Sequence, residues 1–136
     1  MKQAIIDTDT LSYFFRGDSP VVSKIDNYLV EFGFVYISII TYYEVLNGLL
    51  YKDANKQIKR FKEFVGYNSI LQLTILSVDK SARIYADLRK TGKIISHNDV
   101  LIAGIALTND LILITNNTAH FERIPELEID NWTIQK

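Results

Sequence analysis

The sequence predicts an α/β fold in which a mostly parallel sheet of four to five strands lies between two layers of helices. Short apolar runs alternate along the chain with longer segments whose apolar residues recur at the helical period. This alternation is typical of parallel sheets that are covered by helices on both faces. Polar residues directly follow several of the apolar runs, and open parallel sheets bind their ligands at that edge.

The first part of the chain predicts one strand and two helices. Residues 4–6 form an apolar run that ends in polar residues, as a buried strand does. Residues 11–16 are expected to form a short helix, with Asp9 as its N-cap and Gly17 as its end. Residues 21–32 carry apolar side chains at the helical period and predict a second helix.

The next segments predict a strand followed by two helices. Residues 34–39 are β-branched and aromatic, which favours a strand. Residues 41–50 are expected to be helical, with Thr41 and Glu44 in the spacing of a capping box at the start. Residues 54–65 predict a further helix.

The second half continues the same alternation of strands and helices. A third strand is expected over residues 71–76 and a fourth over residues 111–114, and both runs are apolar. The segments between them predict helices over residues 79–91 and 98–108. A short helical turn at residues 119–123 and a fifth strand within residues 126–132 complete the prediction.

Length and composition indicate one globular domain over residues 1–136. The chain has 136 residues, of which 48% are apolar and 23% charged, and no linker or low-complexity segment divides it. Fifteen Lys and Arg against sixteen Asp and Glu give a net charge of −1. This balance argues against a generally basic nucleic-acid binder, but it allows a local basic surface. The absence of cysteine excludes disulfides and thiolate metal ligands.

The hydropathy pattern predicts a cytoplasmic protein. The apolar run over residues 100–107 is far shorter than the ~20 residues that a membrane-spanning helix needs. The N-terminal apolar run ends at Asp7, before it reaches the length of a signal-peptide core. We therefore expect no membrane association.

Three acidic residues are the candidate catalytic groups. Asp7 follows the first strand directly, where an open sheet places its ligands, although a helix cap or an Asx-turn explains it equally well. Glu44 opens the helix after the second strand, and alone it is better explained by helix capping. Asp99 opens an otherwise apolar helix, in which Ala103 and Ala106 share its face and allow close approach to the sheet. For Asp99 we favour a functional role, because Ser96 and Asn98 already serve as caps.

The chemistry expected of three converging carboxylates is that of a metal-dependent hydrolase. Their mutual repulsion would raise their pKa values unless a cation lay among them. Oxygen ligands without cysteine or a matched histidine pair favour Mg²⁺ or Mn²⁺ over zinc. Such an ion activates water and stabilises charge on phosphate oxygens. We therefore predict that Asp7, Glu44 and Asp99 bind the metal and that the protein hydrolyses a phosphodiester.

Four segments resemble one family, and together they cover essentially the whole chain. They are IIDTDTLSYFF, TYYEVLNGL, HNDVLIAGIAL and LILITNNTAHFERIP. In this order and spacing they resemble PIN-domain proteins, specifically the VapC-like ribonuclease toxins of type II toxin–antitoxin modules. The resemblance implies a three-layer α/β/α domain, an endoribonuclease that uses Mg²⁺ or Mn²⁺, a VapB-like antitoxin partner and a homodimer. It further implies that the substrate is a defined RNA, such as the initiator tRNA or a ribosomal RNA loop.

The resemblance also assigns roles to individual residues. Asp7, Glu44 and Asp99 match the three family acids, of which the first and third usually bind metal directly. Asn117 is a further candidate catalytic residue. It stands where many PIN domains have a fourth acid, which puts a second metal ion in doubt. Four further residues near these motifs are candidate substrate contacts, and for each of them a turn or surface role is the alternative: Thr115, Asn116, His97 and His120.

Basic residues gather in two places that RNA phosphates could occupy. One group lies on the fourth predicted helix and its approach, where a solvated helix face is an equally good explanation: Lys52, Lys56, Lys59, Arg60 and Lys62. The other lies closer to the acidic motifs: Arg16, Arg89, Lys90 and Lys93. We expect Arg16 to contact the substrate.

Two other functions stay open on the sequence alone. A PIN-fold module that binds RNA or protein without cleaving it is the main alternative, because Asn117 replaces the fourth acid. A metal-dependent phosphatase or nuclease acting on DNA or small phosphoesters would use the same acidic site.

Overall fold

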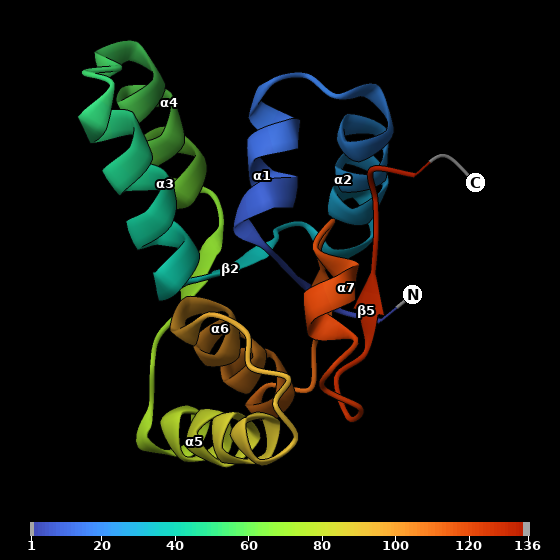
Figure 1. Ribbon diagram of the computed structural model, residues 1–136. Coiled ribbons are helices and arrows are strands. Elements are labelled where there is room, and N and C mark those ends of the chain that lie inside the picture. The colour runs from blue at the N-terminus through green and yellow to red at the C-terminus, as the bar shows by residue number, and fades with distance from the viewer. Residues whose placement is uncertain (1, 135–136) are drawn as a thin grey trace.

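The computed structural model describes residues 2–134, and a five-stranded sheet lies at its centre (Figure 1). The strands stand in the order β3-β2-β1-β4-β5, and every neighbouring pair is parallel. The predicted α/β class is thereby confirmed. The elements in chain order are β1 (Ala4–Ile6), α1 (Thr8–Phe15), α2 (Ser19–Phe32), β2 (Tyr36–Ser38), α3 (Ile39–Tyr51), α4 (Asn55–Gly66), β3 (Ser69–Leu71), α5 (Ile75–Lys90), α6 (His97–Thr108), β4 (Ile112–Ile114), α7 (Thr118–Phe121) and β5 (Ile129–Asp130).

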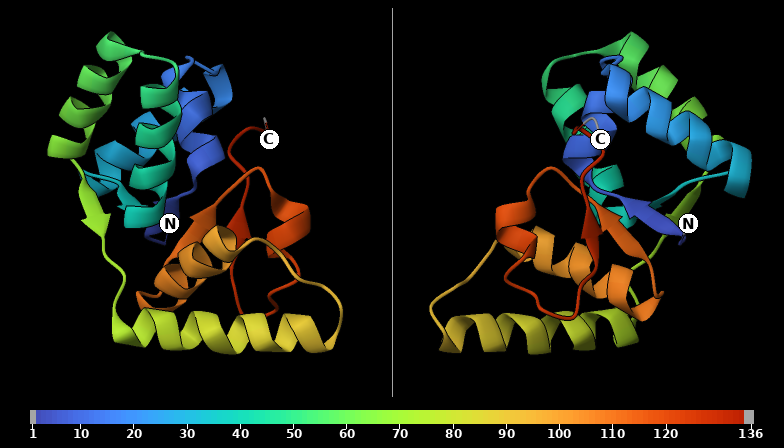
Figure 2. Two further views of the ribbon diagram at one scale, coloured as in Figure 1. Left: turned by 60° about the vertical axis from the view of Figure 1, so that its left-hand side comes forward. Right: turned by 90° about the vertical axis from the view of Figure 1, so that its right-hand side faces the viewer.

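Side chains of the central strands alternate between two apolar cores. Ile5 and Leu113 belong to the core under α5 and α6, whereas Ile6 and Ile114 belong to the core under α1 and α2. This is the two-residue period of a strand that is buried on both faces. Figure 2 shows α6 against one face of the sheet with α5 beyond it, and α1 and α2 on the opposite side. The predicted layers of helices on both faces are confirmed.

The strand order reverses between β1 and β4. The chain runs from β1 outward to β2 and β3, and then crosses to β4 and β5 on the other side. Ligands of open parallel sheets bind at such a reversal, beyond the carboxyl ends of the strands. Asp7 follows β1 and Thr115 follows β4, so both residues lie at this point.

Helix α6 is buried along most of its length, as its apolar sequence predicts. Residues 102–106 are all buried. Gly104 lets α5 approach closely, because a Cβ there would overlap the Ser81 side chain and the Ser77 carbonyl. This contact packs α6 against α5, and Asp99 lies in the first turn of α6.

The third strand differs from its prediction over residues 71–76. Strand β3 ends at the first of these residues, and Ile75 already begins α5. The Thr74 hydroxyl accepts the Ser77 N–H at 3.0 Å, and the Ser77 hydroxyl accepts the Thr74 N–H at 2.9 Å. This capping box starts a helix in an apolar stretch. Ile75 is 91% exposed, so its apolar character does not mark a buried strand.

Two predicted helix caps are also wrong. Asp7, not Asp9, is the N-cap of α1, and its carboxylate accepts the next backbone N–H at 2.8 Å. Helix α3 begins before Thr41, after the N-cap Ser38, so Thr41 and Glu44 form no capping box. Both helices start directly after a strand, without an intervening turn. The Asp9 and Glu44 carboxylates are therefore available for other contacts.

The remaining elements occur in the predicted order, with shifted ends. The largest of these shifts is at the start of α5, which is predicted over residues 79–91 and formed by Ile75–Lys90. The fifth strand is predicted within residues 126–132 and formed by Ile129–Asp130. Within residues 2–134, no helix is long and apolar enough to cross a membrane.

Candidate active site

Asp7 is held rigidly at the carboxyl end of β1. Its backbone N–H donates to the Ile114 carbonyl of β4 at 2.8 Å. Its Oδ1 accepts the Thr8 N–H and its Oδ2 accepts the Thr115 hydroxyl, both at 2.8 Å. Asp7 is only 5% exposed. Two neighbouring strands therefore fix its orientation.

The environment of Asp7 disfavours its negative charge. Burial raises the pKa of Asp7 to about 7, and the nearby charges of Asp9 and Asp99 act in the same direction. The hydrogen bonds from Thr115 and Thr8 lower the pKa but do not offset this rise. Within residues 2–134, no Lys or Arg forms an ion pair with Asp7. A buried, uncompensated carboxylate of this kind favours a bound cation.

Asp99 lies in the first turn of α6. Its N–H donates to the hydroxyl of the N-cap Ser96 at 3.2 Å, so Ser96 has the capping role that the sequence assigns to it. Burial raises the pKa of the Asp99 carboxyl, the charge of Glu44 raises it further, and contacts with Ser96 and His120 lower it. The side chain is 19% exposed. Asp99 is thus more open to solvent than Asp7, and it faces the same carboxylate cluster.

Glu44 reaches this cluster from the second turn of α3. Its Oε1 accepts the hydroxyl of Thr8 at 2.8 Å, and that hydroxyl oxygen lies 3.0 Å from Oγ1 of Thr41. These contacts join the start of α1 to α3 and hold the Glu44 carboxylate close enough to Asp99 for its charge to raise the Asp99 pKa. Thr8 was not predicted as a site residue.

Asp9 is a fourth carboxylate at the site that sequence reasoning treated only as a cap. Its oxygens accept the Thr10 N–H at 2.6 Å and the Asn116 N–H at 3.1 Å. The side chain therefore ties the first turn of α1 to the loop after β4. The signal for it was the repeated acid-hydroxyl pattern of residues 7–10, which directly follows a buried strand.

The polar groups of the loop after β4 mainly form hydrogen bonds within the protein. Thr115 is fully buried, and its hydroxyl donates to Asp7 and accepts the Asn117 N–H at 3.0 Å. The Asn116 side-chain oxygen accepts hydrogen bonds from Asn131 at 3.0 Å and from Thr133 at 3.1 Å. Thr115 and Asn116, predicted as substrate contacts, therefore both have structural partners.

Asn117 and His120 form a polar pair beside Asp99. Nδ2 of Asn117 lies 2.8 Å from Nδ1 of His120. The same His120 nitrogen lies 3.8 Å from Oδ2 of Asp99. The amide at the fourth acidic position of the family thus contacts a histidine. His120 is exposed, and its ring stands at the edge of the carboxylate cluster.

Arg16 and His97 lie outside this cluster. Arg16 stands at the opposite end of α1 from Asp7, about 12 Å along an eight-residue helix. There it contacts the Tyr13 ring, with the guanidinium carbon 4.7 Å from the ring centroid. It also lines a groove of about 410 Å³ between α1, α3 and α4, together with Lys52 and Arg60. His97 opens α6 on the side that faces α5.

The donor set fits a hard divalent ion. No group of three His, Asp or Glu side chains within residues 2–134 is arranged as a ready metal site. Mg²⁺ does not require such a group, because it usually takes one or two carboxylates and keeps several waters. Asp7 and Asp99 offer carboxylate oxygens, both have raised pKa values, and neither is paired with Lys or Arg in the described chain. They are the residues that would hold the ion.

The sequence pattern of the PIN domain matches residues 4–127. The chain belongs to the PIN-domain family. The resemblance found in the four sequence segments is therefore confirmed, and the carboxylate cluster at the strand reversal lies in a PIN domain.

Named relatives of this PIN domain align over nearly its whole length. It is 29% identical over 134 residues to "Ribonuclease VapC2" of Haemophilus influenzae, covering 97% of this chain and 99% of the relative. It is 25% identical over 134 residues to "tRNA(fMet)-specific endonuclease VapC" of Shigella flexneri, covering 98% of this chain and 100% of the relative.

Solved structures share its fold. A chain of the DNA-bound VapBC complex of Salmonella typhimurium has a TM-score of 0.85 at 25% identity and covers 97% of this chain and 99% of its own. A chain of VapBC2 from Rickettsia felis, bound to a DNA fragment from its promoter, has a TM-score of 0.85 at 24% identity. The match covers 95% of this chain and 98% of the Rickettsia chain.

Proposed function

We propose that this PIN-domain protein is an endoribonuclease toxin of a toxin–antitoxin system, which uses Mg²⁺ or Mn²⁺ to hydrolyse phosphodiester bonds in RNA in the cytoplasm. The observation that carries the proposal is the buried, unpaired Asp7 beside Asp99 at the strand reversal, with both pKa values raised. The names of the relatives, a ribonuclease and a tRNA(fMet)-specific endonuclease, support RNA as the substrate. The initiator tRNA is accordingly the first RNA to test.

The carboxylates divide the chemical work according to their surroundings. Asp7, fixed by Thr115 and by its own helix, and Asp99, at the start of α6, would hold the ion. When bound, the ion supplies positive charge to the reacting phosphate and lowers the pKa of a nearby water. Glu44 has one oxygen committed to Thr8, and its second oxygen can orient the attacking water and accept its proton.

Charge-removing variants test this assignment. Asp7→Asn and Asp99→Asn are expected to stay folded and to lose at least about 100-fold in RNA cleavage, more than the loss of an outer partner of a metal ligand costs. Asp110→Asn is a matched control, because Asp110 lies at the far end of α6. Total RNA and purified initiator tRNA are incubated with Mg²⁺, Mn²⁺ or EDTA, and the cut ends are sequenced. Growth inhibition on expression should follow the same pattern.

Each other outcome points to a different function. Cleavage at the wild-type rate by either variant would place the site elsewhere. RNA binding without metal-dependent cleavage would favour the non-catalytic module, for which Asn117 at the fourth acidic position is the supporting feature. Preferential hydrolysis of DNA or of small phosphoesters would indicate a different metal-dependent hydrolase.

The partners follow from the same proposal. The structural neighbours are described as VapBC complexes, so we expect a VapB-like antitoxin for this chain. We also expect a homodimer, because Ile75 and Leu76 are 91% and 67% exposed close to the edge strand β3. Light scattering after size exclusion measures the dimer. An upstream overlapping reading frame whose product blocks RNA cleavage would identify the antitoxin.

A further inference from the structure

Two aromatic rings are stacked on the side of α6 that faces away from the carboxylate cluster. The rings of His97 and Tyr85 are nearly parallel, with centroids 4.5 Å apart and an interplanar angle of 29°. Tyr85 on α5 is half-buried and holds the histidine in place, whereas His97 is exposed. The histidine ring is therefore fixed and at the same time accessible to a further flat group.

The two rings line a groove of about 320 Å³ between α5 and the start of α6. Its walls are mainly apolar, because Ala82 and Ala86 leave room along α5 and Val100 lies at the base. Arg89 lines the same groove. Its size is at the lower end of small-molecule sites and can admit one nucleobase.

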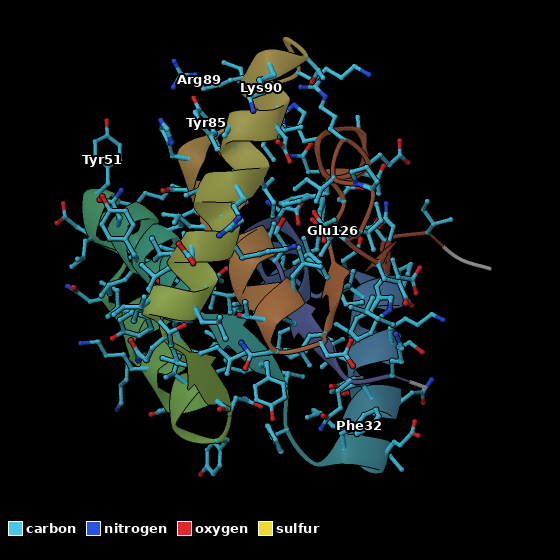
Figure 3. All side chains as sticks on the ribbon, turned by 90° about the horizontal axis from the view of Figure 1, so that it is seen from below. Phe32, Tyr51, Tyr85, Arg89, Lys90 and Glu126 are labelled. Atoms are coloured by element: carbon cyan, nitrogen blue, oxygen red, sulfur yellow. The ribbon has the colours of Figure 1, made fainter. Side chains whose placement is uncertain are left out.

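The surroundings of this groove are positively charged. Residues 89–93 carry three cations and no acid. Arg89, Lys90 and Lys93 are exposed, and none of them forms an ion pair with another residue in the described range 2–134. Figure 3 shows Tyr85, Arg89 and Lys90 together at the C-terminal end of α5. This charge complements a polyphosphate backbone.

The groove is also within reach of a substrate at the carboxylates. His97 is the first residue of α6 and Asp99 is the third, so both lie in one helical turn. A strand whose reacting phosphate lies at Asp99 can pass the start of the helix and place a neighbouring nucleotide beside His97.

We infer that the His97–Tyr85 stack is a binding subsite for one base of the RNA strand next to the cleaved phosphate, with Arg89 contacting a backbone phosphate. This inference rests on the proposed function. It adds His97, Tyr85 and Arg89 as the residues that bind the RNA beside the cleaved phosphate. Unstacked RNA bases are commonly bound on aromatic side chains, including histidine, beside basic residues.

Binding to two oligomers separates base stacking from phosphate attraction. The probes are a short oligoadenylate and an oligomer of the same length and backbone that carries no bases, both labelled with a fluorophore. All variants are made in the full-length chain that also carries Asp7→Asn, so that the probe stays intact in Mg²⁺. His97→Ala should weaken oligoadenylate binding about fivefold or more, the lower end of the cost of removing a stacking side chain, and leave base-free binding unchanged. Arg89→Ala should weaken both.

Matched variants identify what each loss means. His97→Phe keeps a stacking ring and should retain oligoadenylate binding. Tyr67→Ala removes an exposed aromatic ring at the end of α4, and Arg83→Ala removes a cation of α5 that does not line the groove. Both should bind like the parent protein, and circular dichroism checks that every variant is folded.

Two results would overturn the inference. One is unchanged oligoadenylate binding by His97→Ala, and the other is an equal loss for both oligomers. If the wild-type protein meanwhile cuts RNA in Mg²⁺, the groove inference alone fails. If the wild type neither cuts RNA nor binds either oligomer, the proposed function fails with it.

Discussion

The Thr8 hydroxyl donates a hydrogen bond to Oε1 of Glu44 at 2.8 Å, across the boundary between α1 and α3. Thr8 directly follows Asp7, so one short segment positions two carboxylates of the cluster. Asp7 is oriented by the Thr8 backbone N–H and Glu44 by the Thr8 side chain. Replacing this hydroxyl with a methyl group should therefore affect catalysis without removing any acid.

The variant Thr8→Val is expected to lower kcat for RNA cleavage by about tenfold or more, in the range measured for residues that orient metal-site ligands. KM should change little, because the side chain acts on Glu44 and not on the bulk of the RNA. Thr8→Ser keeps the hydroxyl and should retain most of the activity. Steady-state cleavage of a labelled RNA gives both constants.

The control for this variant is Thr108→Val. The Thr108 hydroxyl donates within its own helix to the Gly104 carbonyl at 2.9 Å, at the end of α6 that lies away from the site. The Thr108→Val variant should cleave RNA like the wild type. An unchanged kcat for Thr8→Val would show that its contact with Glu44 is not needed for cleavage.

The sequence predicted the elements better than the contacts between them. The alternation of apolar runs and helical segments was enough to predict the parallel sheet, because burial on both faces forces that pattern. Asp7 could be predicted because it follows β1 at the edge where strand ends meet, and Asp99 because it opens an apolar helix on the face that carries Ala103 and Ala106. The acid-hydroxyl pattern of residues 7–10 marks this segment, but the contacts of Thr8 and Asp9 could not be predicted, because their partners Glu44 and Asn116 are distant in sequence.

Predictions from local sequence were wrong where the same residues can form either of two local structures. Ile75 continues an apolar run and suggests a strand, but the reciprocal hydrogen bonds of Thr74 and Ser77 start a helix there. Asp9 has a typical cap identity, but Asp7 takes the cap because α1 begins directly after β1. The exposure of Ile75 and the absence of a turn between β1 and α1 depend on tertiary structure, which cannot be read from one sequence.

The stability of the metal-free protein should fall as pH rises from about 4 to about 7. The pKa of Asp7 is raised from 3.8 to about 7 in the folded state, chiefly by burial. Between these two values the folded chain holds a proton that the unfolded chain has lost, so the free energy of unfolding decreases with pH. The raised pKa of Asp99 acts with the same sign. For Asp7 the change is at most about 4 kcal/mol.

Urea unfolding at a series of pH values in EDTA measures this effect. Asp7→Asn cannot ionise there, so its stability should depend less on pH and exceed that of the wild type above neutrality. Mg²⁺ should stabilise the wild type more at high pH than at low pH, because it binds the ionised carboxylates. Identical pH profiles for the wild type and Asp7→Asn would contradict the assignment of the titrating group.

Asn117 is expected to act by positioning and not by binding metal. Its side-chain nitrogen contacts Nδ1 of His120 at 2.8 Å. Asn117→Ala leaves His120 without this partner and should lower kcat/KM for RNA cleavage about tenfold, less than Asp99→Asn. Asn109→Ala is the control, since that amide bonds to the Ile105 carbonyl within α6. A loss as large as that of Asp99→Asn would mean that Asn117 itself belongs to the metal site.

Arg16 is expected to contribute affinity without sequence preference. It is exposed at the end of α1 and shares a groove with Lys52 and Arg60. Arg16→Ala should weaken binding uniformly across RNAs and reduce the slope of log K against log salt by about 1, as the loss of one phosphate contact does. Lys24→Ala on α2 should leave the slope unchanged. A sequence-dependent loss would indicate a base contact instead.

Gly104 determines how closely α5 packs against α6. A Cβ at Gly104 would overlap the Ser81 side chain and the Ser77 carbonyl, so Gly104→Ala should destabilise the fold by about 2–3 kcal/mol through overpacking. Gly48→Ala is the matched helical control. Its added methyl meets nothing within 4 Å, so this variant should be neutral or more stable by about 0.5–1 kcal/mol. Urea unfolding of both variants measures the difference.

Adding Ser81→Ala to Gly104→Ala separates the two overlaps. Ser81→Ala removes the side-chain oxygen but leaves the Ser77 carbonyl, which belongs to the backbone of α5 and cannot turn away. The double variant should therefore recover little of the lost stability, particularly because the Ser81 hydroxyl also donates to the Val100 carbonyl at 2.9 Å. Full recovery would show that the Ser81 side chain, and not the approach of the two helix backbones, is what requires glycine at this position.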